Sequence, residues 1–411
     1  MSPEVTSIIV LLVVFVVGTV RSVNLGILGF AAAYAVAQLS LGLTADDVVA
    51  LFPGDLFLVL VALTLLFGFA QHNGSIEVLV TWIMRACCGR VALAPWVFFL
   101  LAAVLIALGA LFAVAIVAPL ALPFARRYKL DQLMMGMMVV HGALAGAFSP
   151  ISVYGVTIAG FLGDDVPFEP LTLFLVPLVF DVGVAGVLYA VRGGWRAAGR
   201  IDEDADGEGA TSARATPYQL VTLGALLVLA VGTTAFGLDI TSLALVLATL
   251  LALAKPDAAK QALGSVSWSV VVLVTGMVTY IEVLQLAGTV EFVSDGITAL
   301  GVPLLAALLL YYLAGVTSAM ASSVGIISVA IALAVPFLQA GDLDPVLFVV
   351  GLAIASTIVD VSPFSTNGAL VLANVPEEER DAYYRRLLGY AGIVVAVGPG
   401  LAWATVLAPG W

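Results

Sequence analysis

The sequence predicts an all-α polytopic membrane protein made of two inverted repeats, and three observations lead to this fold class. Apolar residues make up 62% of the 411 residues and charged residues only 10%, which is far from the composition of a soluble domain. The motif S-P-x-S-x-x-G occurs twice, at 149–155 and 362–368, and interrupts a long apolar run each time. All 15 Lys and Arg residues fall on one side when the chain is threaded as ten crossings and two hairpins.

Eight apolar runs are interpreted as helices because most approach the roughly 20 residues that cross a bilayer. They lie at 6–20, 23–42, 55–72, 170–191, 217–236, 239–254, 266–284 and 386–407. The first run has no preceding basic residue, so we expect a retained helix rather than a secretory signal. Segments 75–90 and 289–299 fit either interfacial amphipathic helices or ordinary connecting helices.

Four longer apolar runs indicate two interrupted crossings and two hairpins. Runs 131–163 and 345–374 contain the repeated motif, whose proline and glycine disfavour a continuous helix, so each is expected to cross as two half-helices. A broken helix at membrane depth must line a polar space, and two such breaks indicate a transporter's binding site. Runs 92–125 and 303–338 are long for one crossing and have small residues at their centres, so we expect re-entrant hairpins.

The distribution of charge predicts the orientation of the chain. With the N-terminus outside, every basic residue faces the cytoplasm. Matching segments recur 213 or 214 positions apart, and five crossings per half invert the second half relative to the first. We therefore expect a first repeat at 1–192, a cytoplasmic linker at 193–216 and a second repeat at 217–411, in the plasma (inner) membrane with both termini extracytoplasmic.

Several classes of protein are disfavoured by composition. The net charge of −12 argues against a nucleic-acid partner. Two adjacent cysteines exclude a disulfide framework. The chain has two histidines and neither H-E-x-x-H nor G-x-S-x-G, so we expect no enzyme. A passive channel is a further alternative, although duplicated broken helices favour a carrier with alternating access.

Candidate anion ligands lie at the two breaks, because no Lys or Arg is predicted at membrane depth. Half-helices that begin after Pro150 and Pro363 direct their N–H groups at the breaks. The candidate donors to a substrate carboxylate are Ser149, Ser152, Ser362, Ser365, Thr366 and Asn367. For each hydroxyl the alternative is a bond to the backbone of its own helix, which is common for Ser and Thr in membranes.

Three ionisable residues are predicted at membrane depth, where charge is costly and usually functional. Asp360 lies two residues before the second motif and is a candidate cation ligand or proton carrier. Asp181 is a second coupling candidate, and His141 is a candidate sensor of substrate charge or pH. The alternatives are a protonated structural acid and a hydrogen-bonded structural histidine.

Paired hairpins, paired Pro-broken helices and inverted halves resemble the divalent-anion/sodium symporter family of the ion-transporter superfamily. Within it, 318–323 and 362–369 are most similar to the MatC-type dicarboxylate (malonate) carrier branch. The resemblance implies a homodimer with a scaffold made of the first three helices of each half, and a transport domain that moves as an elevator. It also implies secondary active import of a small dicarboxylate, malonate- or succinate-like, with transported sodium and no organic cofactor.

In these symporters each hairpin tip carries Ser-Asn-Thr, which contacts sodium and a substrate carboxylate. The resemblance implies these ligands by position: for sodium Ser318, Ser322, Ser323 and the carbonyls of Val361 and Ser362, for a second sodium the carbonyls of Phe148 and Ser149, and for substrate at the tips Gly109, Ala110, Ser322 and Ser323. The inner tip has lost its hydroxyls. The alternative is therefore a proton-coupled organic-anion carrier or antiporter that uses Asp360, Asp181 or His141.

Overall fold

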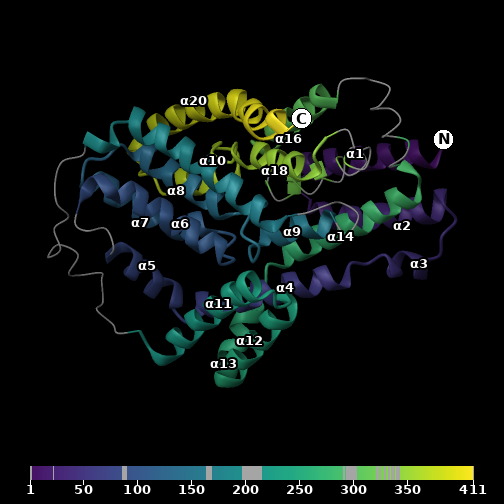
Figure 1. Cartoon of the computed structure of the whole chain (residues 1–411), viewed down its shortest axis with the longest axis horizontal. Coiled ribbons are helices and arrows are strands. Elements are labelled where there is room, and N and C mark those ends of the chain that lie inside the picture. The colour runs from purple at the N-terminus through teal and green to yellow at the C-terminus, as the bar shows by residue number, and fades with distance from the viewer. Residues whose placement is uncertain are drawn as a thin grey trace.

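Every secondary-structure element in the computed structural model is a helix over the residues that it describes, as the sequence predicts (Figure 1). The structure describes residues 2–410 except 22, 86–89, 163–168, 197–214, 290–291, 293–302, 321–322, 324, 328–329, 332–333, 335–337 and 339–342. The candidate ligand Ser322, most of the predicted linker 193–216 and much of 321–338 in the second predicted hairpin therefore lie outside the described residues.

Most helices follow the predicted runs to within three residues, but the helix predicted at 386–407 begins at Glu377, and the short helices Ala45–Ala50 and Pro256–Gly264 were not predicted. Those of the first half are α1 (Pro3–Arg21), α2 (Leu25–Ser40), α3 (Ala45–Ala50), α4 (Gly54–His72), α5 (Ser75–Arg85), α6 (Ala94–Ala107), α7 (Ala113–Arg127), α8 (Gln132–Gly146), α9 (Val153–Leu162) and α10 (Pro170–Val191). Those of the second half are α11 (Pro217–Phe236), α12 (Ile240–Ala254), α13 (Pro256–Gly264), α14 (Trp268–Leu286), α16 (Pro303–Ser318), α18 (Pro345–Thr357), α19 (Thr366–Ala373) and α20 (Glu377–Ala402). Within the described residues, α4, α10, α11, α14 and α20 with its continuation to Leu407 are long and apolar enough to cross a membrane.

Polar side chains start corresponding helices in the same way. The first N–H groups of a helix have no partner inside it, and a capping carboxylate satisfies one of them. Asp131 caps α8 by accepting from the N–H of Met134 at 2.8 Å, and Asp344 caps α18 by accepting from the N–H of Leu347 at 2.9 Å. These caps fix where the two interrupted runs begin.

Helices that lie about 213 positions apart, one in each half, pack in equivalent pairs. α2 packs on α14 as α12 packs on α4, and α6 packs on α8 as α16 packs on α18. In Figure 1, α11, α12 and α13 lie below α4, whereas α16, α18 and α20 lie together along the upper edge. α8 lies between α6 and α10 and is buried from Leu133 to Gly146, so the helix that leads into the first break is part of the core.

The contact between α2 and α14 excludes side chains. A Cβ on Gly26 would collide with the carbonyl oxygen of Val272, and a Cβ on Gly276 with the carbonyl oxygen of Gly26. A Cβ on Gly29 would lie 2.8 Å from the Gly276 carbonyl oxygen. Close backbone packing through small residues is how helices associate in lipid, where burial of apolar surface from water gives no driving force. The first half is therefore joined to the second by direct backbone contact.

Candidate functional site

The first motif forms the interruption between α8 and α9. Ser152 Oγ donates to the carbonyl oxygens of Ala147 and Ser149, the latter at 2.8 Å, and accepts from the N–H of Gly155 at 3.0 Å. Ser149 Oγ accepts from the N–H of Ile151 at 3.4 Å. One hydroxyl thus bonds the last turn of α8 to the first turn of α9.

The second motif repeats this pattern between α18 and α19. Ser365 Oγ donates to the carbonyl oxygens of Asp360 at 2.9 Å and Ser362 at 2.7 Å, and accepts from the N–H of Gly368 at 3.4 Å. Ser362 Oγ accepts from the N–H of Phe364 at 3.2 Å. Each of these residues lies 213 positions after its counterpart in the first break.

These contacts explain the serine and glycine that close the motif. A Cβ on Gly155 would collide with the Ser149 carbonyl oxygen, and a Cβ on Gly368 with that of Ser362. The second serine of each motif is fully buried and its hydroxyl proton is donated to the main chain. Because a hydroxyl has one proton, these serines are not free to donate to a carboxylate in this conformation, and the structural alternative fits them.

Asp360 is the centre of a buried polar network at the second break. Its side chain is almost inaccessible, and Oδ2 accepts hydrogen bonds from Ser323 Oγ at 2.9 Å and from Asn367 Nδ2 at 2.8 Å. Oδ1 has no partner within the described part of the chain, and the same is true of the buried Ser318 Oγ. Since buried polar atoms are normally bonded, each of these two oxygens still has room for a hydrogen-bond donor or a cation.

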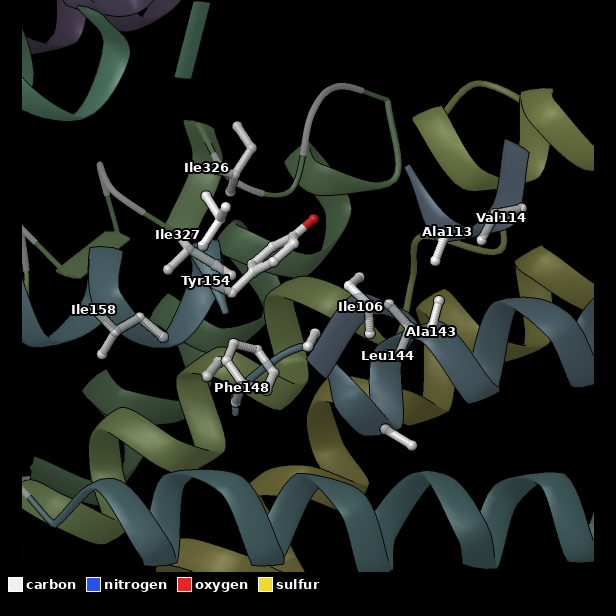
Figure 2. Packing of buried hydrophobic residues seen from close by; sticks show 14 of the residues in the cluster. Ile106, Ala113, Val114, Ala143, Leu144, Phe148, Tyr154, Ile158, Ile326 and Ile327 are labelled. Carbon is white, nitrogen blue, oxygen red and sulfur yellow. The ribbon is translucent and has the colours of Figure 1, made fainter. Parts of the chain in front are cut away.

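Tyr154 extends this network and was not among the residues predicted from the sequence. Its hydroxyl lies 3.1 Å from Ser323 Oγ, and its ring packs edge-on against Phe148 with the centroids 5.8 Å apart. Figure 2 shows the hydroxyl oxygen pointing away from Phe148. A tyrosine in an apolar half-helix looks like core in the sequence. The available signal was its position in the motif, where the second copy has Asn367.

Three members of this network, Tyr154, Asp360 and Asn367, line a cavity of about 810 Å³. Asp360, Thr366 and Asn367 line it at the second break, and Tyr154 lines it from α9. The other walls come from several segments: Leu111 and Phe112 beyond the inner tip, Met320, Gly325 and Ile326 beyond α16, Gly18, Val23, Asn24 and Leu25 around the start of α2, and Ser265 to Val270 with Leu273 around the start of α14. Among these described residues, Asp360 is the single charged one.

A second cavity of about 320 Å³ reaches the first break from other elements. Phe148 and Pro150 line it together with residues of α9, and Asp55 and Asp239 line it at the starts of α4 and α12. Under the predicted topology these helix starts are extracytoplasmic, whereas the loops before α2 and α14 are cytoplasmic. The smaller cavity thus reaches the first break from the predicted extracytoplasmic side. The larger cavity reaches the second break from the predicted cytoplasmic side.

His141 and Asp181 form a separate network on α8 and α10. His141 Nδ1 lies 2.9 Å from Asp181 Oδ1, and His141 Nε2 lies 2.7 Å from the hydroxyl of Tyr390 on α20. Both members of the pair are buried. The structure thus brings two of the three coupling candidates together and places Asp360 in the other network. In the described residues no three His, Cys, Asp or Glu side chains gather as a metal cluster.

The remaining candidates lie close to these networks. Gly109 adopts a φ of +108° and Ala110 is buried, directly before the lining residues Leu111 and Phe112. Val361 is buried between Asp360 and Ser362. Of the residues whose carbonyls are candidate sodium ligands, Phe148 lines the smaller cavity, and Val361 directly follows Asp360, which lines the larger one.

A helical membrane-spanning fold with a cavity at a broken helix is typical of a transporter, and comparison with known proteins agrees. Residues 1–147 match the family model described as dicarboxylate carrier protein MatC N-terminus. The crystal structure of the YdaH transporter from Alcanivorax borkumensis is similar in fold, with a TM-score of 0.66 and 14% identity, over 100% of this chain and 99% of that chain. No curated protein sequence matches. The resemblance to MatC-type carriers is confirmed over residues 1–147, and the whole chain shares its fold with the YdaH transporter.

Proposed function

We propose that this protein imports a small dicarboxylate, malonate- or succinate-like, by secondary active transport coupled to sodium. The observation that carries the proposal is the state of Asp360, a buried carboxylate on the larger cavity whose Oδ2 is bonded twice and whose Oδ1 has no partner among the described residues. The match of residues 1–147 to a dicarboxylate carrier model supports the class of substrate.

The charge of Asp360 gives a physical reason for coupling. A substrate carboxylate about 4 Å from Asp360 would be repelled by about 4 kcal/mol at an effective dielectric constant of 20. A cation on the free oxygen removes this repulsion and attracts the substrate. Sodium is a hard cation that prefers oxygen, and Ser318 Oγ at the end of α16 is a second buried oxygen that has no partner among the described residues. We propose that Ser322, Ser323 and the carbonyls of Val361 and Ser362 complete this site.

Helix N-termini provide the positive potential for the anion. The first residues of α2, α14 and α19 line the cavity, and each helix presents partial positive charge at that end. Thr366 is exposed at the start of α19 and is the proposed hydroxyl donor. Ser149 and Ser362 accept backbone N–H groups through their oxygens and keep a proton for a carboxylate. Ser152 and Ser365 shape the breaks that hold these groups.

The proposed architecture is two inverted repeats with re-entrant hairpins at 92–125 and 303–338, which move as an elevator within a homodimer. The recurring caps, helix pairs and break hydrogen bonds support the repeat. α6 and α7 pack on each other, and Gly109 in the turn between them has a φ of +108°, which supports a hairpin that enters and leaves on one side. The elevator and the homodimer rest on the family resemblance.

Proton coupling is the second candidate, and the His141–Asp181 pair favours it. If His141 is neutral, Nδ1–H donates to Asp181 and Nε2 accepts from the Tyr390 hydroxyl. If it is protonated, Nε2–H donates to the same hydroxyl oxygen, because a phenol is both donor and acceptor. The pair is therefore able to hold a proton without losing a hydrogen bond.

Uptake by purified protein in proteoliposomes tests both candidates. Labelled malonate and succinate are offered with an inward sodium gradient, with an inward proton gradient at equal sodium, or with neither. We expect saturable uptake that only the sodium gradient accelerates. Uptake that only the proton gradient accelerates would refute sodium coupling and favour proton coupling. If neither acid is taken up under any gradient, the dicarboxylate assignment is overturned.

A further inference from the structure

Tyr154 and Asn367 occupy the same position in the two motifs, 213 residues apart, and their side chains end in the same network. Asn367 donates directly to Asp360 Oδ2 at 2.8 Å. Tyr154 reaches the same oxygen through Ser323, at 3.1 Å and then 2.9 Å. The network therefore contains α9 from the first half, the chain beyond α16, and the second break.

The direction of these hydrogen bonds follows from their proton count. Ser323 has one hydroxyl proton and donates it to Asp360 Oδ2, so its oxygen is left to accept. The phenol of Tyr154 has one proton, which it donates to Ser323. A chain in one direction results, from Tyr154 through Ser323 to the carboxylate. Chains of this kind strengthen each member, and more so in a buried site.

We propose that Tyr154 is a positioning residue for the coupling cation: it holds Ser323 against Asp360 and so keeps Oδ1 free and oriented for the ion. This inference rests on the proposed cation coupling and extends it to a residue of the first half. Because α9 belongs to the first broken helix and Ser323 to the second predicted hairpin, the bond couples cation binding to the seating of that hairpin on the opposite half.

The variant Tyr154→Phe removes only the hydroxyl. One hydrogen bond contributes about 0.5–1.5 kcal/mol, so the sodium concentration for half-saturation is expected to rise about two- to tenfold. Maximal uptake at saturating sodium is expected to stay close to that of the wild type. The readouts are sodium-driven uptake in proteoliposomes and sodium-dependent thermal stabilisation of the purified protein, with potassium as the replacement ion, because a bound ion raises stability according to its affinity.

Tyr280→Phe is the matched control. The Tyr280 hydroxyl is fully buried and donates to the Ser7 carbonyl oxygen at 2.7 Å, away from the cavity. This variant loses a hydrogen bond of the same kind and is expected to keep the wild-type sodium half-saturation. The second test variant is Ser323→Ala. Since Tyr154 acts through Ser323, the double variant is expected to bind sodium no more weakly than Ser323→Ala alone.

The outcomes separate this inference from the function on which it rests. If sodium neither drives uptake by the wild-type protein nor stabilises it, both the sodium coupling and this inference are overturned. Wild-type protein that responds to sodium, with Tyr154→Phe equal to it, overturns only the role of Tyr154. Strictly additive effects of the two substitutions also overturn that role. If Tyr154→Phe does not fold, Tyr154→Leu, which also removes the hydroxyl, carries the test, and an unchanged sodium half-saturation in that variant refutes the proposal.

Discussion

The substitution Asp360→Asn tests the coupling most directly, because it removes the charge and keeps the shape. An amide whose oxygen takes the place of Oδ2 still accepts from Ser323 and Asn367. Its NH₂ group then stands where Oδ1 is free in the wild type. A cation arriving there meets a donor instead of a carboxylate, so the variant imitates the neutralised site.

The expected effect is large because the site is buried. Two unit charges about 4 Å apart attract by about 4 kcal/mol at an effective dielectric constant of 20, which is roughly a thousandfold in affinity. The desolvation penalty that the carboxylate no longer has offsets part of this, and we expect sodium to bind at least about a hundredfold more weakly. The repulsion between Asp360 and the substrate also disappears, so substrate binding is expected to lose its sodium requirement.

The assay has two parts. Thermal stabilisation of the purified protein by malonate or succinate is measured with sodium and with potassium, and uptake is measured in proteoliposomes with and without a sodium gradient. In Asp360→Asn we expect equal stabilisation in both salts and no acceleration by the gradient. Asp257→Asn, which changes an exposed acid at the start of α13, is the control and should behave as the wild type. Wild-type sodium dependence in Asp360→Asn would refute the reasoning.

Four further substitutions test the breaks, the scaffold, the second network and the orientation. Gly368→Ala places a Cβ against a fixed carbonyl, so we expect loss of uptake with the protein still in the membrane. Gly276→Leu overpacks the backbone contact with α2 by about 1–3 kcal/mol or more, measured as a lower melting temperature in detergent. Tyr390→Phe leaves one ring nitrogen of His141 without its hydrogen bond. It should lower the free energy of unfolding by about 1–3 kcal/mol, measured as a lower melting temperature in detergent. In a cysteine-free background, Ser267→Cys should react with an impermeant thiol reagent only after cells are permeabilised, and labelling of intact cells would reverse the predicted topology.

The fold was largely predictable because its signals are local. Apolar runs of sufficient length gave the helices, and the S-P-x-S-x-x-G motif gave the positions of both interruptions. The contacts account for the residues of the motif. Ser152 and Ser365 hydrogen-bond the two half-helices together, and the glycine leaves room for a carbonyl oxygen that a Cβ would strike. The sequence left these two serines as either substrate donors or backbone-bonded groups, because residue type identifies a donor but does not show which protons the main chain uses.

The site was harder to predict because its contacts are long-range. Asp360 was selected for being an acid at membrane depth, yet its partner Ser323 is 37 residues away and Tyr154 is 169 residues from Ser323. No periodicity connects these segments. The pairing of His141 with Asp181, 40 residues apart, was equally invisible, although both residues had been singled out. Chemistry indicates which residues are costly to bury, and only packing shows which of them share a network.

The two breaks differ most at one position, and that difference bears on stoichiometry. The carbonyl that accepts from the second motif serine belongs to Ala147 in the first break and to Asp360 in the second, at the same 213-residue offset. One backbone geometry therefore presents a methyl group on one side and a carboxylate on the other. Ala147 is buried and offers no ligand, so a cation at the first break would depend on carbonyl oxygens alone. Because a desolvated cation is costly without a compensating charge, we expect the tightly bound coupling ion at Asp360 and at most a weak one beside Phe148. Titration of sodium against the wild type and Asp360→Asn should thus show one high-affinity site that disappears in the variant.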